Sequence, residues 1–443
     1  MPVRLPESEP VATPSPAPAV RPVSGALFVG MLTIFWLEYL RPGNFLPGVH
    51  AMHVNTVVPL AVALATFLSR DGRPHAHVVR ATDTKLFLVL LVLFVSQAFT
   101  ADVRIYVFET LKGVAGYLLL YYMIVRHVTT LRRLKVVMAT MALVHVVMIA
   151  LYPEVVLDPE TRHVVGGTFL GDGNDFAWSV CMLIPFALFL ANTSAKPGAK
   201  VAYYGVCVVL LLAVVGTQSR GGSLALVASI GYVAMKSKRR FLAVTGIAAL
   251  VAIVVAFAPS TYFDRMDTIV NWESEGSAQG RMLAWKSATS MALDHPITGV
   301  GAGHFGVKFG FEYKPAGYRG PYLNAHSIYF AILAEFGFPG LIILVALLAG
   351  NAVRNGRIIR SLQGRDSPAA DVNRKLMVTM QASLIAYAVA GAFLSGVFYP
   401  HLFVLAALME AARHLARSGA WPHAQRARLL PQSGNHKSPA SGT

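Results

Sequence analysis

The stretch SIYFAILAEFGFPGLIILVALLAG at residues 327–350 decides the fold class, because it is mostly apolar and long enough to cross a bilayer. The hydrocarbon core of a bilayer is roughly 30 Å thick and takes about 20 helical residues. Similar runs recur along the chain, and together they predict an all-α polytopic membrane protein of about 12 transmembrane helices. The other predicted spans are residues 24–39, 54–68, 86–99, 105–125, 134–151, 176–191, 201–216, 222–235, 241–257, 376–395 and 402–415.

The composition agrees with a membrane protein. Hydrophobic residues make up 55% of the 443 residues and charged residues only 14%, and the apolar residues are bunched into runs. A net charge of +16 does not indicate nucleic-acid binding here, because most of the excess lies beside predicted spans, where it faces anionic head groups. Cys181 and Cys207 fall in separate spans, so we expect two buried apolar residues rather than a disulfide or a metal pair.

The chain is expected to form one transmembrane domain with two tails. Residues 1–23 are a Pro- and Ala-rich polar tail, residues 24–415 form the domain, and residues 416–443 form the second tail. No cleavage pattern follows the first apolar run, so we expect that run to remain as an anchor. The loop at residues 259–326 is long enough to contain helices of its own.

The distribution of basic residues predicts the orientation. An even number of spans puts both termini on one side, and Lys and Arg near span ends remain cytoplasmic. The tails and alternate loops carry 27 of the 38 basic residues, so both termini are predicted to be cytoplasmic. The other eleven face outward or lie within a span, and a cluster of them would suit a polyanion such as a pyrophosphate. They are Arg41, Arg104, Lys112, Arg162, Arg220, Arg265, Arg281, Lys286, Lys308, Lys314 and Arg319.

The long outer loop contains a predicted helix that carries one of these arginines. Ser277 can cap a helix that runs to about residue 293, ahead of a His-Pro pair. Arg281 and Trp285 are four residues apart and therefore share a face. We expect this helix to lie at the membrane surface and to cover a cavity.

Two further residues stand where water meets the bilayer. Arg220 lies in a very short outer loop, where an arginine is costly unless it is paired or hydrated, although it could also reach the interface. His326, in the motif NAHS with Asn324, lies at the mouth of a span, where partial desolvation can place its pKa in the range of a general base. The alternative for His326 is an interfacial or capping residue.

The glycine-rich stretch GVGAGHFG at residues 299–306, which contains His304, follows the loop helix. No strand precedes it, so it is not a dinucleotide fingerprint. Its glycines permit a tight turn and a close backbone approach, either to a neighbouring helix or to a substrate.

Several other residues are weaker candidates for substrate contact. Lys112 lies within a predicted span and can either bind a phosphate or pair with Glu109. Arg41 and Arg104 can be interfacial anchors or substrate ligands. Tyr329 and Trp285 could border a sugar path, although packing or interfacial roles are also open.

The segment GTFLGDGNDFAW at residues 167–178 opens a predicted span. Its acidic residues could bind a metal through oxygen, but one acidic cluster is weak evidence for such a site. We expect Asn174 or Asp175 to cap the helix and Asp172 to balance a neighbouring arginine.

These motifs follow one another in a specific order. In this order the motifs resemble the O-antigen ligase and polymerase superfamily of bacterial inner membranes. They are GTF-GDGND, SRGG, GRMLAW, HPITGVGAGHF and NAHSIYFAILAEFGFPG. The resemblance covers about residues 166–347, and the earlier spans match only in number and hydrophobicity.

The resemblance implies a fold, an activity and a set of site residues. It implies a twelve-span architecture related to the C-type glycosyltransferases and glycan transfer from undecaprenyl pyrophosphate on the periplasmic side. Its paired arginines correspond to Arg220 and Arg281, and its histidine to His326. It also implies no metal, no cofactor and no nucleotide sugar. Arginines can stabilise a departing pyrophosphate and a histidine can deprotonate the acceptor hydroxyl, so direct, inverting attack is expected.

The acceptor distinguishes the functions within this superfamily. We expect an O-antigen ligase that uses lipid A-core in the inner membrane of a Gram-negative bacterium. An O-antigen polymerase and a protein O-oligosaccharyltransferase are alternatives with the same donor. A secondary transporter is the alternative from another class, although the unusual charges gather at the outer face rather than at the midplane of both halves.

Overall fold

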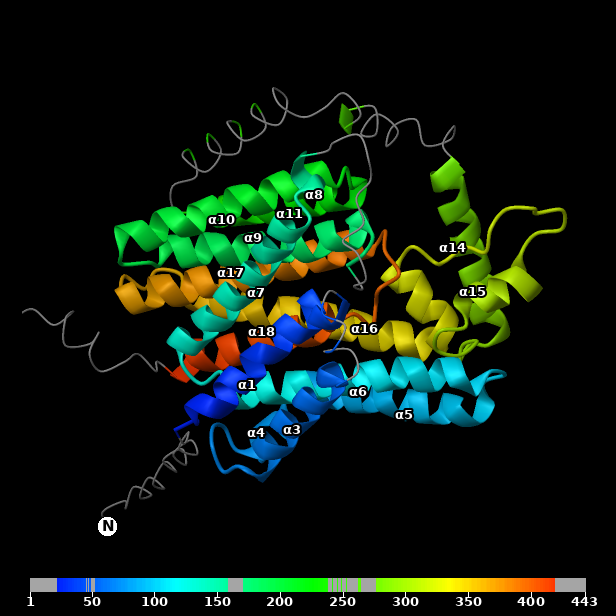
Figure 1. Cartoon of the computed structure of the whole chain (residues 1–443), viewed down its shortest axis with the longest axis horizontal. Helices are drawn as coiled ribbons and strands as arrows, with labels where there is room; N and C mark the ends of the chain where they lie inside the picture. The colour runs from blue at the N-terminus through cyan, green and yellow to red at the C-terminus, as the bar shows by residue number, and fades with distance from the viewer. Residues whose placement is uncertain are drawn as a thin grey trace, which may run out of the picture.

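The computed structural model of the chain is built from helices packed side by side (Figure 1). It describes residues 22–44, 52–157, 170–237 and 276–418, with single positions at 46, 48, 241, 245, 248, 252, 262 and 263. No strand occurs among these residues, in agreement with the all-α prediction. Most of the predicted span 241–257, most of the loop from 259 to 275, and tail residues 1–21 and 419–443 lie outside the described residues.

The helices follow the predicted apolar runs. The α-helices are α1 (Gly25–Phe35), α3 (Val54–Leu68), α4 (His75–Arg80), α5 (Thr82–Thr100), α6 (Arg104–His127), α7 (Leu131–Leu151), α8 (Glu154–Leu157), α9 (Gly173–Asn192), α10 (Pro197–Gly216), α11 (Arg220–Lys236), α14 (Gly276–Asp294), α15 (Phe305–Lys308), α16 (Ile328–Ser361), α17 (Pro368–Gly391) and α18 (Pro400–Ser418). Short turns of other helix types are η1 (Trp36–Leu40), η2 (Pro42–Asn44) and η4 (Phe309–Tyr313).

Six of the described helices are long and apolar enough to cross a membrane, namely α5, α6, α7, α9, α10 and α16. The predicted spans near α1 and α3 coincide with shorter apolar helices. Those near α11, α17 and α18 coincide with helices that are either shorter or less apolar. The described part of the chain is therefore that of a polytopic membrane protein, and the total of 12 spans remains a prediction.

Helix α9 is the centre of the bundle. It packs against α7, α10, α11 and α17. The fully buried Trp178 donates its indole N–H to the carbonyl of Tyr387 in α17 over 3.1 Å. Cys181 contacts the carbonyl of Gly222 in α11 at 3.2 Å. Cys181 and Cys207 are both free and buried, as predicted, so they act as small apolar residues.

Helix α16 bends at Gly337, where the backbone has a φ of +63°. A side chain at this position would collide with the carbonyl oxygen of Pro296. The freed amide of Phe338 donates to that same carbonyl over 2.9 Å. The loop that follows α14 therefore packs against α16 at the bend. Glycine is required at this position because its φ is positive and because the Pro296 carbonyl approaches so closely.

The glycine-rich stretch packs onto the same part of α16. Val300 N–H donates to the carbonyl of Ala334 over 2.9 Å, and Gly299 has a φ of +65° with no room for a side chain beside Glu335. Of the two expected roles for these glycines, close packing against a neighbouring helix is the one seen in the structure.

Helices α14 and α15 lie together at one end of the bundle (Figure 1). Helix α14 corresponds to the predicted loop helix, and its buried face includes Ala284, Ala288 and Met291. Ser277, predicted to be its N-cap, lies inside the helix instead. An ion pair of 2.5 Å between Lys308 and Asp102 connects α15 to the segment after α5.

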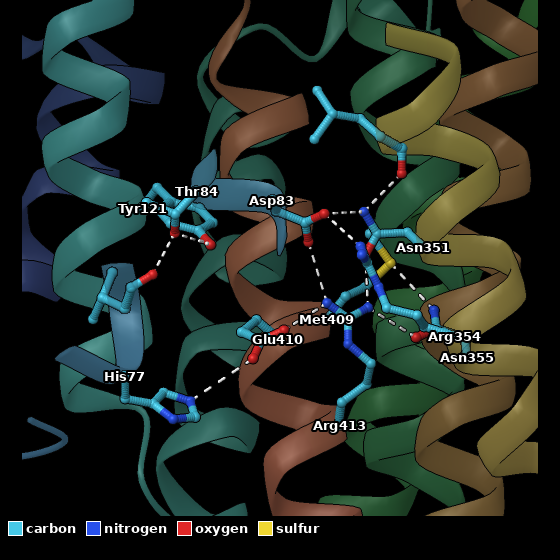
Figure 2. Close-up of polar contacts among 12 residues, drawn as sticks. His77, Asp83, Thr84, Tyr121, Asn351, Arg354, Asn355, Met409, Glu410 and Arg413 are labelled. Atoms are coloured by element: carbon cyan, nitrogen blue, oxygen red, sulfur yellow. Dashed lines mark hydrogen bonds and ion pairs between the residues drawn. The ribbon is translucent and has the colours of Figure 1, made fainter. Parts of the chain in front are cut away.

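A buried ionic cluster joins α5, α16 and α18 near the opposite end of α5 (Figure 2). The side chain of Asp83 is fully buried and pairs with both Arg354 and Arg413. Arg413 also donates to Asn351 Oδ1 over 2.6 Å and to Glu410 over 2.8 Å. Because each charge has a partner, this cluster can hold three helices together inside the apolar bundle.

Candidate functional site

A cavity of about 610 Å³ contains the three residues predicted to be catalytic. Arg220, Arg281 and His326 all line it, although they lie far apart in the sequence. They come from the start of α11, the second turn of α14 and the residue pair ahead of α16. The fold therefore brings the three together in one cavity beside α14.

Arg220 is the first residue of α11, and its backbone is fixed by the turn before it. Gln218 has a φ of +51°, which reverses the chain between α10 and α11. Ser219 caps α11 by accepting a hydrogen bond of 3.1 Å from the amide of Gly222. The short connection predicted for Arg220 is confirmed, since α10 ends at Gly216.

Arg281 is positioned by the way α14 is attached to the start of α16. Trp285, one turn later, donates its indole N–H to the carbonyl of Ala325 over 2.9 Å. Its ring also stacks on Phe330, with centroids 5.1 Å apart and an angle of 11°. Trp285 therefore anchors α14 beside His326, which keeps Arg281 at the cavity.

His326 has an unusual backbone and a shifted pKa. Its φ is +47°, and its amide donates a hydrogen bond of 2.7 Å to Ser395 Oγ. Burial and, secondarily, the positive charge of Arg281 lower the pKa of His326, whereas Asp172 opposes the shift. The imidazole is therefore neutral at neutral pH and able to accept a proton.

Asp172 lines the cavity and also caps α9, a role that was expected for Asn174 or Asp175. It is the N-cap of α9 and accepts from the backbone and side-chain amides of Asn174, each over 2.7 Å. Neither Asn174 nor Asp175 caps this helix. Asp175 instead accepts a hydrogen bond of 3.2 Å from Tyr399. Asp172 lines the same cavity as both arginines, in keeping with a carboxylate that moderates their charge.

The basic candidates on the first half of the chain lie outside the cavity lining. The side chain of Lys112 is 71% exposed and lies 3.7 Å from Glu109, the pairing expected if it has no substrate role. Arg104 is an exposed residue at the start of α6. Arg41 has a φ of +47° and lies 3.5 Å from Glu38, at the end of η1.

The buried histidine of the glycine-rich stretch holds the fold together. The two ring nitrogens of His304 contact backbone groups, with Nδ1 2.9 Å from the carbonyl of Ala302 and Nε2 accepting from the amide of Val103 over 3.2 Å. Its ring also packs edge-on against Tyr106. His304 thus connects the stretch to the beginning of α6 and is absent from the cavity lining.

The remaining weaker candidates, Tyr329 and Asn324, lie close to His326 in the sequence but outside the cavity lining. Tyr329 donates its hydroxyl to the carbonyl of Ala388 over 2.9 Å and so joins α16 to α17. Asn324 is exposed two residues before His326, with its side-chain oxygen near Gly306. Neither residue is part of the cavity lining.

Two residues that line the cavity or hold the neighbouring loop were not predicted from the sequence. Gln218 lines the cavity, and its place directly before the SRGG motif was the available signal. Gln97 in α5 donates to the carbonyls of Thr298 and Glu335 over 2.8 Å and 2.6 Å and accepts from the amide of Ala302 over 3.0 Å. Nothing in the sequence around Gln97 indicates that it binds a loop two hundred residues later.

The donor set of the cavity suits an anion better than a cation. Within the described ranges no group of three or more His, Cys, Asp or Glu side chains is arranged to hold a metal ion. The polar lining combines two guanidinium groups and amide donors from Asn174 and Gln218 with one carboxylate. Guanidinium groups bind phosphate oxygens in pairs, so a phosphorylated ligand fits this chemistry.

Comparison with known proteins supports the family expected from the motifs. The family model described as O-antigen ligase matches residues 205–345, which run from α10 into α16 and include Arg220, Arg281 and His326. None of the curated proteins compared with the chain matches it. This match agrees with the motif order, so residues 205–345 are similar to the O-antigen ligase superfamily, whose members are glycosyltransferase-like enzymes.

Proposed function

We propose that this protein is an O-antigen ligase that transfers a glycan from undecaprenyl pyrophosphate to lipid A-core. The observation that carries the proposal is the meeting of Arg220, Arg281 and His326 in one cavity within the family match. A pair of arginines suits a pyrophosphate, and a neutral histidine suits a hydroxyl that must lose a proton.

Arg220 and Arg281 have the role of binding the donor pyrophosphate. Each guanidinium can give two parallel N–H donors to phosphate oxygens. Charge builds up on the pyrophosphate as the bond from the anomeric carbon to its oxygen breaks. The arginines stabilise that charge and therefore lower the barrier without a divalent cation in the step.

His326 has the role of general base. The acceptor hydroxyl oxygen attacks the anomeric carbon and forms the new glycosidic bond as its proton passes to the imidazole. Undecaprenyl pyrophosphate leaves from the opposite face, so the anomeric configuration is inverted and no covalent glycosyl-enzyme forms. Removal of the His326 imidazole should lower the rate of transfer by a factor of about 10²–10⁴, the usual range for a positioned base.

The orientation of the protein is part of the proposal. The cavity lies at the N-terminal end of α9, while the basic loop between α9 and α10 lies one helix length away, or about 30 Å for a 20-residue helix. We propose that the loop end faces the cytoplasm with both termini, because basic residues collect there. The cavity, α14 and α15 then face the periplasm of a Gram-negative inner membrane with 12 spans in total.

The proposed function is tested by reconstitution in a chelator and without ATP. Purified protein is mixed with undecaprenyl-pyrophosphate-linked O-antigen and lipid A-core, and the products are separated on a gel. We expect a ladder attached to lipid A-core. Longer glycan that remains on undecaprenyl pyrophosphate would identify a polymerase instead, and glycan on a protein acceptor would identify an oligosaccharyltransferase. Transport of lipid-linked glycan without any new bond would support a transporter.

A further inference from the structure

A second cavity lies at the other end of the bundle from the candidate active site. Its volume is about 750 Å³, and it is formed where α9 and α11 end and where α10 and α17 begin. The candidate active site lies at the opposite ends of α9 and α11, beside Asp172 and Arg220. The two cavities are thus separated by the length of α9 and cannot share one ligand head group.

The second cavity carries an excess of positive charge. Four cationic side chains line it, namely Lys200, Lys236, Arg374 and Lys375, against the single carboxylate of Asp371. Asp371 is already paired, at 3.1 Å from Arg374 and 2.7 Å from Lys375. Among the described residues, no carboxylate lies within ion-pair distance of Lys200 or Lys236.

The positions of these cations are set by the helices. The Nη1 group of Arg374 donates to the carbonyl of Lys236 over 3.0 Å, which joins the start of α17 to the end of α11. Lys200 lies in the first turn of α10 and lines the same cavity. Arg374 is therefore held in the lining by a backbone contact, whereas Lys200 and Lys236 are exposed.

Part of the wall of this cavity is apolar. Pro185, Leu188 and Phe189 of α9, Val233 of α11 and Val378 of α17 all line the cavity. A cavity lined by both cations and hydrocarbon suits an amphiphile with an anionic head. A soluble phosphate or a nucleotide would leave the apolar wall uncovered.

We propose that this cavity binds an anionic glycerophospholipid from the surrounding bilayer. The head-group phosphate is held by Lys200 and Lys236, and the acyl chains cover the wall formed by α9, α11 and α17. Basic pockets between transmembrane helices on the cytoplasmic side are suited to such head groups, and each basic residue near an anionic surface adds about 1 kcal/mol of attraction. The proposal does not depend on which glycan acceptor the protein uses.

The test measures phospholipid bound to the purified full chain. The protein is exchanged into mixed micelles that contain phosphatidylglycerol or phosphatidylcholine, and the retained lipid is counted by native mass spectrometry. We expect selective retention of phosphatidylglycerol. In the Lys200→Gln/Lys236→Gln double variant its affinity should fall about 25-fold, from about fivefold for each lysine removed. Lys196→Gln, an exposed change at the N-cap of α10, one turn before Lys200 and outside the cavity lining, should retain the lipid like the wild type.

Three outcomes would overturn the proposal. Equal retention of the two lipids would exclude recognition of the anionic head. A loss in Lys196→Gln as large as that in the double variant would show that only overall charge matters. Protection of the protein against heat by inorganic phosphate alone, equal to that by phosphatidylglycerol, would assign the site to a free anion. The same thermal measurement without added ligand shows whether the double variant is folded.

Discussion

At the scale of single residues, His326 is the group whose surroundings decide the chemistry. Its backbone is held in the left-handed region by the hydrogen bond from its amide to Ser395, and its ring is flanked by charges of opposite sign. Burial and Arg281 lower its pKa, and Asp172 raises it. Because the net shift is downward, the imidazole is neutral at neutral pH, as a base for a sugar hydroxyl requires.

The first prediction is the pH dependence of transfer. Activity should rise with pH through the pKa of His326, and this acidic limb should lie below 6.5, the ordinary value for histidine. Asp172→Asn should move the limb to lower pH, because it removes the carboxylate that raises the pKa while asparagine still caps α9. A profile of kcat/KM against pH measures both shifts. A limb that moves upward or stays unchanged in Asp172→Asn would contradict the proposed charge balance.

The second prediction concerns the histidine itself. His326→Gln keeps a side chain of similar size that can form hydrogen bonds but cannot take up the proton. Its rate of transfer should fall about 10²–10⁴-fold, with little change in donor binding. Single-turnover kinetics with radiolabelled donor separate the two quantities. Full activity in His326→Gln would show that the residue does not act as the base.

At the scale of elements, the site depends on how the loop after α14 is attached to α5 and α16. Gln97 connects α5 to two backbone groups of that loop, in Thr298 and Ala302, and to the carbonyl of Glu335 in α16. The bend at Gly337 allows α16 to accept the same loop. These contacts attach the loop after α14 to α5 and to α16, which begins two residues after His326.

The third prediction tests this attachment. Gln97→Leu removes the donor and acceptor and leaves buried backbone groups of the loop without partners, at about 1–3 kcal/mol for each group. We expect a lower midpoint of thermal unfolding and slower transfer. Val95→Ala, an exposed change in the same helix, is the matched control and should do neither. Wild-type stability in Gln97→Leu would mean that the loop is held by other contacts.

Most of the helices, but not all of their ends, could be predicted from the sequence. The apolar runs predict most helices, because a bilayer fixes both their length and their composition. The stop signal of the loop helix, a His-Pro pair, is confirmed because α14 ends at Asp294, whereas its start signal, Ser277, lies inside the helix. The cap of α9 was misassigned by two or three residues, since Asp172, Asn174 and Asp175 are all good capping residues and only the backbone geometry distinguishes them.

At the scale of the whole molecule, the arrangement of helices could not be derived from periodicity. Arg220, Arg281 and His326 were grouped from a motif order typical of one family, and no local pattern indicates that three elements meet at one cavity. Lys112 and Arg104 were weaker candidates than Arg220 in the sequence, because Lys112 can pair with Glu109 inside a predicted span and Arg104 can be an interfacial anchor. Packing puts Lys112 and Arg104 on the exposed surface of α6, away from the cavity.

The fourth prediction concerns the buried ionic cluster that joins α5, α16 and α18. Asp83→Asn would leave Arg354 and Arg413 in an apolar setting without their common anion (Figure 2). Loss of one partner from a buried pair costs about 3–5 kcal/mol, so thermal unfolding in detergent should occur at a clearly lower temperature. Asp366→Asn, an exposed change between α16 and α17, is the control. Equal midpoints for the two variants would contradict a stabilising role for the cluster.

The central claim is that glycan transfer takes place in the cavity that α11, α14 and α16 form. The most direct test is the single-turnover rate of transfer to lipid A-core in a chelator, for Arg281→Ala against Lys286→Ala, an exposed change on the same helix outside the cavity lining. We expect Arg281→Ala to lose at least about 100-fold, in line with removal of a group that stabilises developing charge, and Lys286→Ala to remain near the wild-type rate. Equal rates for the two variants would contradict the assignment of this cavity as the active site.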